Sequence, residues 1–316
     1  HMSDNSIEIP SLFDNCKPRN DVIKGKLEEQ QFAANLGTVA FEEEGVEVYK
    51  QAKSFFQTTY PTEGLQSILT NLMAQFSTQS EESGQYTNSI LALDTTFGGG
   101  KTHNLIAAYH LANNPEQIEN ISKFSESSDV SSNFKNEING GLEVNTGVFV
   151  GGYVDAQNTR CLENDSDAPN TQTMWGELAY QLFGTEGYEE IKDYDKEQNA
   201  PGEKTLKKLF DEHEGPSLVL IDEIAEYLED ASAVEIGNAT LSSQTLSFLD
   251  SLIETAARVE DLVIVYSIAD TAFTDEAEEV RDQINQMDSI AKRQHRTVAP
   301  TSGTEIGSVL RHRLFE

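Results

Sequence analysis

Cysteine is nearly absent from this sequence. Its two cysteines, Cys16 and Cys161, lie far apart, and neither belongs to a CxxC pair or to a Cys/His spacing that binds zinc. A disulfide-stabilised fold needs paired cysteines, and a structural zinc site needs a set of closely spaced ligands. We therefore expect two ordinary free thiols, with neither a disulfide framework nor a zinc site.

Basic residues are also scarce. The chain has 22 lysines and arginines against 54 aspartates and glutamates, which gives a formal net charge of −32. A surface this acidic repels a phosphate backbone, so we do not expect direct DNA binding over a broad surface of this chain. The acidic residues are scattered among Ser, Thr, Asn and Gln, which favours a halophilic source; the acidic surface of a mesophilic protein is the alternative.

Long apolar segments are missing as well. No run approaches the roughly 18 to 20 residues that span a bilayer, and no signal peptide opens the chain. We therefore expect a cytoplasmic protein without membrane contact. His1-Met2 resembles the remnant of an affinity tag, and residues 308–316 stop inside an amphipathic helical pattern, which indicates an N-terminal fragment.

Five short apolar segments have the length and composition of buried strands, at residues 89–94, 147–154, 217–221, 262–268 and 296–299. Helical or polar stretches separate these segments, and this alternation predicts an α/β fold with a mostly parallel, five-stranded sheet. The clearest helix precedes the first strand, with Thr62 as its expected N-cap.

The pattern along the chain predicts how these elements are grouped. Residues 3–88 are expected to form an N-terminal helical extension, and residues 89–300 the α/β core. A polar insertion at about 113–146 interrupts the core, and we expect only a short helix there, around residues 118–124. Residues 301–316 would be the start of a truncated helical lid.

A glycine-rich motif follows the first strand and opens a helix. Residues 95–102 read Thr-Thr-Phe-Gly-Gly-Gly-Lys-Thr and match the Walker A pattern GxxxxGK[ST], except that Thr95 replaces the first glycine. Glycines let backbone N–H groups approach phosphates, and the positive end of the following helix points at the same place. Lys101 is expected to reach the β and γ phosphates of ATP, and the Thr102 hydroxyl to bind Mg²⁺. The predicted nucleotide-binding residues are Thr96, Phe97, Gly98, Gly99, Gly100, Lys101, Thr102 and His103. The alternative is a glycine-rich turn with an incidental lysine.

A second motif is an apolar strand that ends in two carboxylates, at residues 217–223. This arrangement is typical of a Walker B motif, which places one carboxylate on Mg²⁺ and one near water. We predict that Asp222 binds the metal and that Glu223 orients or deprotonates the attacking water. Acidic residues also terminate strands and cap helices, so this motif gains its weight from the P-loop that accompanies it.

A polar residue stands near the end of the strand expected at residues 262–268. Ser267 occupies a position that resembles the polar sensor of AAA+ ATPases, which faces the γ-phosphate. A serine at a strand end is also a common local turn former, and this alternative stays open.

A locally basic segment, Ala-Lys-Arg-Gln-His-Arg at residues 291–296, stands out in this acidic chain. Arginine stabilises charge on a transferring phosphoryl group, so Arg293 is predicted to be an arginine finger, with Arg296 as the next candidate. A finger donated by a neighbouring subunit would couple hydrolysis to a homo-oligomer. The alternative is a helix C-terminus in which the macrodipole favours cations.

His103 and His110 lie seven residues apart on the helix after the P-loop. Because no Cys, Asp or Glu stands near them at ligand spacing, we interpret both as packing or hydrogen-bonding residues. Trp175, the one tryptophan, is expected in the core.

The order of these motifs resembles the AAA+ ATPase core. The sequence itself is similar to those of prokaryotic ATPases grouped as domain-of-unknown-function family 499. The resembling stretches are residues 32–36, 95–103, 173–182, 200–202 and 220–228. The resemblance implies a three-layer P-loop NTPase fold and the N-terminal motor or switch of a large protein. It also implies a setting similar to that of BREX-type ATPases, in antiviral defence islands beside DNA methyltransferases and helicases.

In AAA+ proteins a helical lid carries a second sensor arginine. The chain stops at what would be the first lid helix, which leaves Arg311 and Arg313 as candidates for that role and makes hydrolysis by this fragment alone an open question.

The leading functional hypothesis is therefore Mg-dependent ATP hydrolysis. A nucleotide-dependent scaffold or switch with slow turnover is the second hypothesis. A P-loop kinase is disfavoured by the adjacent Asp222-Glu223 pair and by the lack of an acceptor-binding motif.

Overall fold

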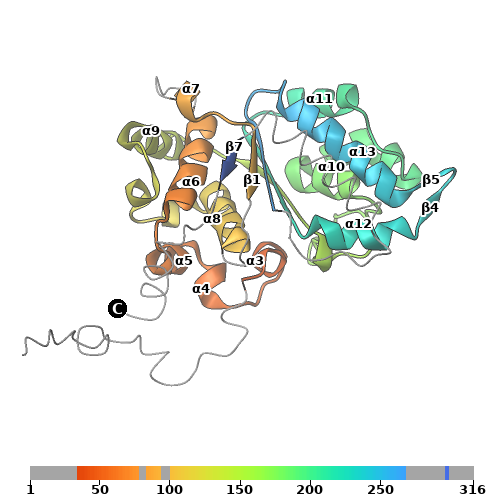
Figure 1. The fold of residues 1–316 in the computed structure, drawn as a ribbon, viewed down its shortest axis with the longest axis horizontal. Coiled ribbons are helices and arrows are strands. Elements are labelled where there is room, and N and C mark those ends of the chain that lie inside the picture. Colours follow the sequence, from red (N-terminus) through yellow and green to blue (C-terminus); the bar gives the residue numbers. More distant parts are fainter. Residues whose placement is uncertain (1–33, 78–82, 94–99, 268–295, 299–316) are drawn as a thin grey trace, which may run out of the picture.

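The computed structural model describes residues 34–77, 83–93, 100–267 and 296–298, and its centre is a parallel sheet (Figure 1). The strand order is β2-β3-β6-β1-β7, and every neighbouring pair is parallel. The strands are β1 (Ile90–Leu93), β2 (Asn145–Val150), β3 (Ser217–Asp222), β6 (Leu262–Ser267) and β7 (Arg296–Val298). The prediction of an α/β fold with a mostly parallel sheet is confirmed.

The five expected strands are not equivalent. Four of them form the body of the sheet, whereas β7 pairs with β1 over only three residues at the edge. Strand β2 also ends at Val150, earlier than expected, because the chain turns there into the 3₁₀ helix η4 (Gly151–Tyr153). The apolar run continues to Val154, so hydrophobicity alone did not reveal this turn.

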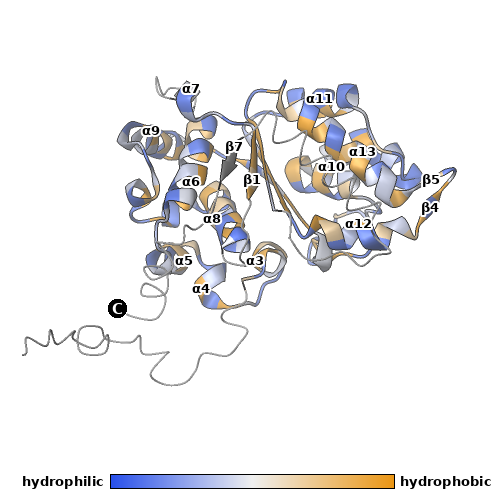
Figure 2. Ribbon diagram, in the orientation of Figure 1, coloured by the Kyte–Doolittle hydropathy of each residue, from blue (hydrophilic) through white to orange (hydrophobic). Residues whose placement is uncertain are grey.

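Strands β1, β2, β3 and β6 each contribute to two hydrophobic layers, because successive side chains point to opposite faces of a sheet. In β1, Leu91 and Leu93 belong to one core and Ile90 and Ala92 to the other. Figure 2 shows the hydrophobic strands between two groups of helices whose outer surfaces are hydrophilic. Burial on both faces explains why these strands are continuously apolar rather than alternating.

The first layer combines the helix after β1 with the N-terminal helices (Figure 1). Its helices are α3 (Leu36–Phe41), α4 (Glu47–Lys50), α5 (Ala52–Thr58), α6 (Glu63–Phe76), α8 (Lys101–Asn113) and α9 (Ser128–Asn139), and the short α7 (Ser83–Tyr86) leads from this layer to β1. Thr62 caps α6 as predicted, with its side chain accepting a hydrogen bond from the Leu65 amide. The N-terminal helices share one core with the sheet and are an integral layer of it.

The polar segment at residues 113–146 differs from the prediction. It contains the 3₁₀ helices η2 (Pro115–Gln117) and η3 (Ile121–Phe124), as expected near residue 121, but also the 12-residue helix α9. Val130 and Phe134 of α9 are fully buried in the first core. Together with the partly buried Ile138, these residues form an apolar stripe at helical spacing on an otherwise polar helix, which the composition of the segment concealed.

The second layer covers the opposite face of the sheet. It consists of α10 (Met174–Glu197), α11 (Glu203–Asp211), α12 (Ile224–Ser232) and α13 (Leu241–Ala256), with a small hairpin of β4 (Glu235–Ile236) and β5 (Ala239–Thr240). Trp175 is buried in this core, as predicted. Among the described helices, none is long and apolar enough to cross a membrane.

A buried carboxylate explains why Thr173 and Gly176 occur in the segment at residues 173–182. Thr173 caps α10, and its backbone N–H and hydroxyl both donate to Asp195, which is fully buried and also accepts from Tyr188. A Cβ atom on Gly176 would lie 2.2 Å from Asp195 Oδ1. A larger residue would push Asp195 away from its hydrogen-bond donors, which a buried carboxylate needs. Only glycine therefore fits at position 176.

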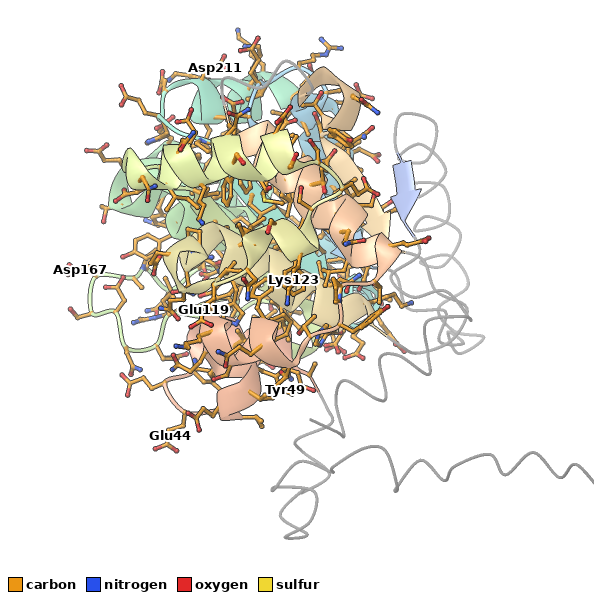
Figure 3. The ribbon with its side chains drawn as sticks, turned by 90° about the vertical axis from the view of Figure 1, so that its left-hand side faces the viewer. Glu44, Tyr49, Glu119, Lys123, Asp167 and Asp211 are labelled. Carbon is orange, nitrogen blue, oxygen red and sulfur yellow. The ribbon has the colours of Figure 1, made fainter. Side chains whose placement is uncertain are left out.

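The outer surface is strongly acidic. Figure 3 shows the exposed Glu44, Asp167 and Asp211 side chains projecting from separate parts of the surface. Described cations form exposed ion pairs, such as Lys53 with Glu119 at 2.7 Å.

The free energy of unfolding is expected to rise between low and molar KCl, because screening weakens repulsion among the excess carboxylates. The salt also weakens exposed ion pairs, but each of these contributes only about 0 to 1 kcal/mol. Denaturant midpoints measured across the KCl range test this, and an unchanged or lower midpoint would contradict a halophilic source. Sulfate is avoided because it strengthens apolar burial by itself.

Candidate functional site

Three polar side chains from distant parts of the sequence meet at the carboxyl ends of the strands. Thr102 stands in the first turn of α8, Asp222 ends β3, and Ser267 ends β6. Strand β6 lies between β1 and β3 in the sheet, so the ends of all three strands reach the same edge. Ligand sites of open α/β sheets lie at this edge.

The Asp222 carboxylate is the centre of this cluster. The Thr102 hydroxyl donates to its Oδ2 at 2.9 Å, and the Ser267 hydroxyl donates to its Oδ1. The Glu223 amide donates to the same Oδ1 at 3.1 Å. Asp222 is only 4% exposed. A carboxylate accepts hydrogen bonds, and these three donors hold the buried side chain in one orientation.

The start of α8 has the geometry of an anion-binding helix N-terminus. Gly100 is its N-cap and has φ 103°, in the left-handed region where glycine is strongly favoured. No side chain caps this end, and Lys101 is the first helical residue. The first N–H groups of a helix have no partner within the helix, and together with the helix dipole they make this end positive, beside Lys101.

Glu223 stands at the junction of β3 and α12 in an uncommon backbone conformation. Its φ of 54° lies in the left-handed region, and the residue is the N-cap of α12. The side chain is half-buried and lies against Gly152. Burial raises the pKa of the Glu223 carboxyl, and neighbouring Asp222 and Glu226 raise it further.

Two glycines after β2 were not predicted as site residues. A Cβ atom on Gly151 would lie 1.9 Å from the Glu223 carbonyl oxygen, and one on Gly152 would lie 2.8 Å from Glu223 Oε2. Gly151 is required by the close approach of the β2 and β3 ends, because its contact is with backbone, whereas a Cβ atom on Gly152 would displace the ends of the Glu223 and Glu226 side chains. The available sequence signal was a Gly-Gly pair directly after an apolar strand.

The histidines of α8 contact the N-terminal helices. His110 is fully buried, and its Nε2 lies 2.6 Å from the Tyr49 carbonyl oxygen; because a carbonyl can only accept, Nε2 carries the proton. Burial lowers the pKa of the His110 imidazole, and the hydrogen bond to Tyr49 opposes this shift. His103 lies 3.0 Å from the Thr59 hydroxyl and packs on Phe55.

These contacts agree with the interpretation of both histidines as packing and hydrogen-bonding residues. His103 directs its ring into this cluster rather than toward Asp222, so its predicted contact with nucleotide would have to involve its backbone. Among the described residues, no group of three or more His, Cys, Asp or Glu is arranged to hold a metal. Mg²⁺ commonly takes only one or two protein oxygens beside phosphates and water, and the Thr102 hydroxyl and Asp222 carboxylate fit that role.

Several predicted site residues lie outside the described residues. They are Thr96, Phe97, Gly98, Gly99 and Arg293. Gly100, Lys101, Thr102, Asp222, Glu223 and Ser267 are described, and all stand at the same edge of the sheet.

Comparison with known families assigns the class of this protein. The family model of the DUF499 N-terminal domain matches residues 12–306, nearly the whole chain, and the chain therefore belongs to this family. Searches of curated proteins and of solved structures found no match.

Proposed function

We propose that this chain binds Mg-ATP at the carboxyl edge of its sheet and hydrolyses it. The observation that carries the proposal is the hydrogen bond from Thr102, which follows Lys101 in the P-loop motif, to Asp222, which precedes Glu223. These two motifs are 120 positions apart in the sequence. A glycine-rich turn and an acidic strand end with no common role have no reason to meet in this way.

Each residue of the site has a separate role in this proposal. The N-terminus of α8 and Lys101 bind the phosphates, and Thr102 and Asp222 hold Mg²⁺. A bound Mg²⁺ neutralises charge that develops on the phosphoryl oxygens. Glu223 is the general base that orients and deprotonates the attacking water, and Ser267 fixes Asp222 through its hydroxyl.

We also propose that the fold is a three-layer P-loop NTPase of the AAA+ type. The sheet lies between two helical layers, and β6 with Ser267 lies between the strand before the P-loop and the strand that ends at Asp222. Ser267 is then the polar sensor, although its contact with Asp222 also suits a purely supporting role.

A nucleotide-dependent switch with little hydrolysis is the second candidate. The arginines whose side chains the structure describes, Arg160 and Arg258, bind Asn170 and Glu203 and do not contact the Asp222 cluster. Phosphoryl transfer needs positive charge beyond Lys101 for a fast rate. In this candidate, turnover stays slow until an arginine from elsewhere completes the site.

The family resemblance also suggests a biological role for this activity. It suggests the motor or switch module of a larger cytoplasmic prokaryotic protein in antiviral defence, with a homo-oligomer and DNA methyltransferase or helicase partners. We do not propose direct DNA binding by this chain, because its net charge of −32 repels phosphate.

Mg-ATP is expected to raise the melting temperature of the protein. A ligand at about 100 times its Kd stabilises the native state by roughly 2.7 kcal/mol. Lys101→Ala should remove this shift, and Thr102→Val should reduce its Mg²⁺ dependence, whereas Thr102→Ser keeps the hydroxyl and should retain it. Thermal unfolding with and without Mg²⁺ measures these effects. A wild-type protein that is folded and binds no nucleotide would show that the P-loop assignment is wrong.

A further inference from the structure

The turn after β2 links the predicted catalytic base to the N-terminal helices. In the middle of this turn, Gly152 lies against the Glu223 carboxylate, since a Cβ atom on Gly152 would be 2.8 Å from Glu223 Oε2. At its end, Tyr153 packs on α3, and the centre of its ring lies 5.4 Å from that of the Phe41 ring. The turn is only three residues long, so a displacement of Tyr153 moves Gly152 directly.

The Tyr153 ring packs against Gly37 of helix α3. A Cβ atom on Gly37 would lie 2.6 Å from Tyr153 Cδ2, so the ring lies directly on the α3 backbone. Asn35 caps α3, and Leu36 beside Gly37 is buried in the first core. The surface that receives Tyr153 is therefore anchored to the body of the protein.

We propose that α3, through Tyr153 and Gly152, is a positioning element of the ATPase site. Gly37 fixes the position of the Tyr153 ring, Tyr153 fixes the turn, and the close contact with Gly152 fixes where the Glu223 carboxylate lies. Glu223 depends on this contact because its backbone is in the left-handed region and its Oε2 lies against Gly152. The proposal deepens the proposed function and rests on it.

A positioning role predicts a loss of rate without a loss of binding. Misplacing a catalytic group by about 1 Å can cost about 100-fold in rate. Tyr153→Ala is therefore expected to lower kcat for ATP hydrolysis by about 10 to 100-fold, with the Kd for Mg-ATP changed by no more than about twofold. Tyr153→Phe keeps the ring and should retain most of the activity.

Gly37→Ala gives an independent perturbation of the same contact. The added methyl group would clash with the ring, so the single variant should lose kcat in the same way as Tyr153→Ala. In the Tyr153→Ala background the clash partner is gone, and Gly37→Ala should have no further effect. Such non-additivity is expected for residues in direct contact, whereas independent effects would add. Gly84→Ala is the matched control, since a Cβ atom there meets nothing within 4 Å.

The experiment measures phosphate release and Mg-ATP binding by the full-length protein, with circular dichroism as the check on folding. Gly152→Ala is a further variant on an exposed glycine, and it should also lose kcat while retaining ATP. Wild-type kcat in folded Tyr153→Ala and Gly152→Ala, or additive effects of Gly37→Ala and Tyr153→Ala, would overturn the inference and leave the proposed function intact. A wild-type protein that binds ATP but never hydrolyses it would overturn both.

Discussion

Glu223→Gln is expected to stop ATP hydrolysis while leaving ATP bound. A general base contributes about 10² to 10⁴ in rate, and the amide cannot accept a proton from water at neutral pH. The substitution keeps the size of the side chain and leaves the Thr102–Asp222 hydrogen bond in place. Phosphate release should therefore fall by about 10² to 10⁴, with Mg-ATP affinity close to that of the wild type.

Glu229→Gln is the matched control for this prediction. Glu229 is an exposed carboxylate on the same helix, α12, and the substitution removes the same charge. If Glu223→Gln hydrolyses ATP as fast as this control, Glu223 is not the base. A parallel loss of ATP binding would instead indicate that Glu223 contributes to binding the nucleotide or the metal.

Arg293→Ala is expected to remove an assembly-dependent gain in activity. Arginine fingers contribute about 10³ to 10⁵ in rate in other NTPases. Neither arginine with a described side chain contacts the Asp222 cluster, and Arg293 itself lies outside the described residues. If Arg293 acts in trans, activity per subunit should rise with the concentration of full-length protein, and Arg293→Ala should abolish the rise without weakening nucleotide binding.

Lys292→Ala serves as the control, because it removes one positive charge from the same basic segment. A loss of less than about tenfold in Arg293→Ala would exclude this residue as the finger and make Arg296 the next candidate. Full activity in a dilute monomer would contradict the assembly hypothesis for any arginine. Phosphate release over a range of protein concentrations, with mass measured in parallel, separates these outcomes.

The two sequence motifs predicted much of the candidate site because their chemistry is local. A phosphate cradle needs glycines, a lysine and a hydroxyl at fixed spacing, and residues 95–102 contain that spacing. Parallel strands also bring their carboxyl ends to one edge, so the strand pattern alone predicts that Asp222 and Ser267 lie near the P-loop. Their hydrogen bonds with each other could not be predicted in this way, because the order of strands in the sheet is decided by non-local packing.

The role of the glycines at the end of β2 could not be predicted from the sequence. Gly151 and Gly152 follow an apolar run without a recognisable motif, and their role depends on how closely the ends of β2 and β3 approach. Helix α9 is a second case, since a composition rich in Ser and Asn concealed two apolar residues that become fully buried. In both places a contact with a distant segment overrides the local pattern.

The sequence by itself determined the alternation of strands and helices and the polar residues at strand ends, because periodicity and spacing are local properties. The tertiary structure decided that the helices within residues 36–76 share one core with the sheet. It also decided that Tyr153 packs on Gly37 and that Gly152 lies against the Glu223 carboxylate. These contacts join segments that lie far apart in the sequence, and they form only where shape and burial allow the chain to close on itself.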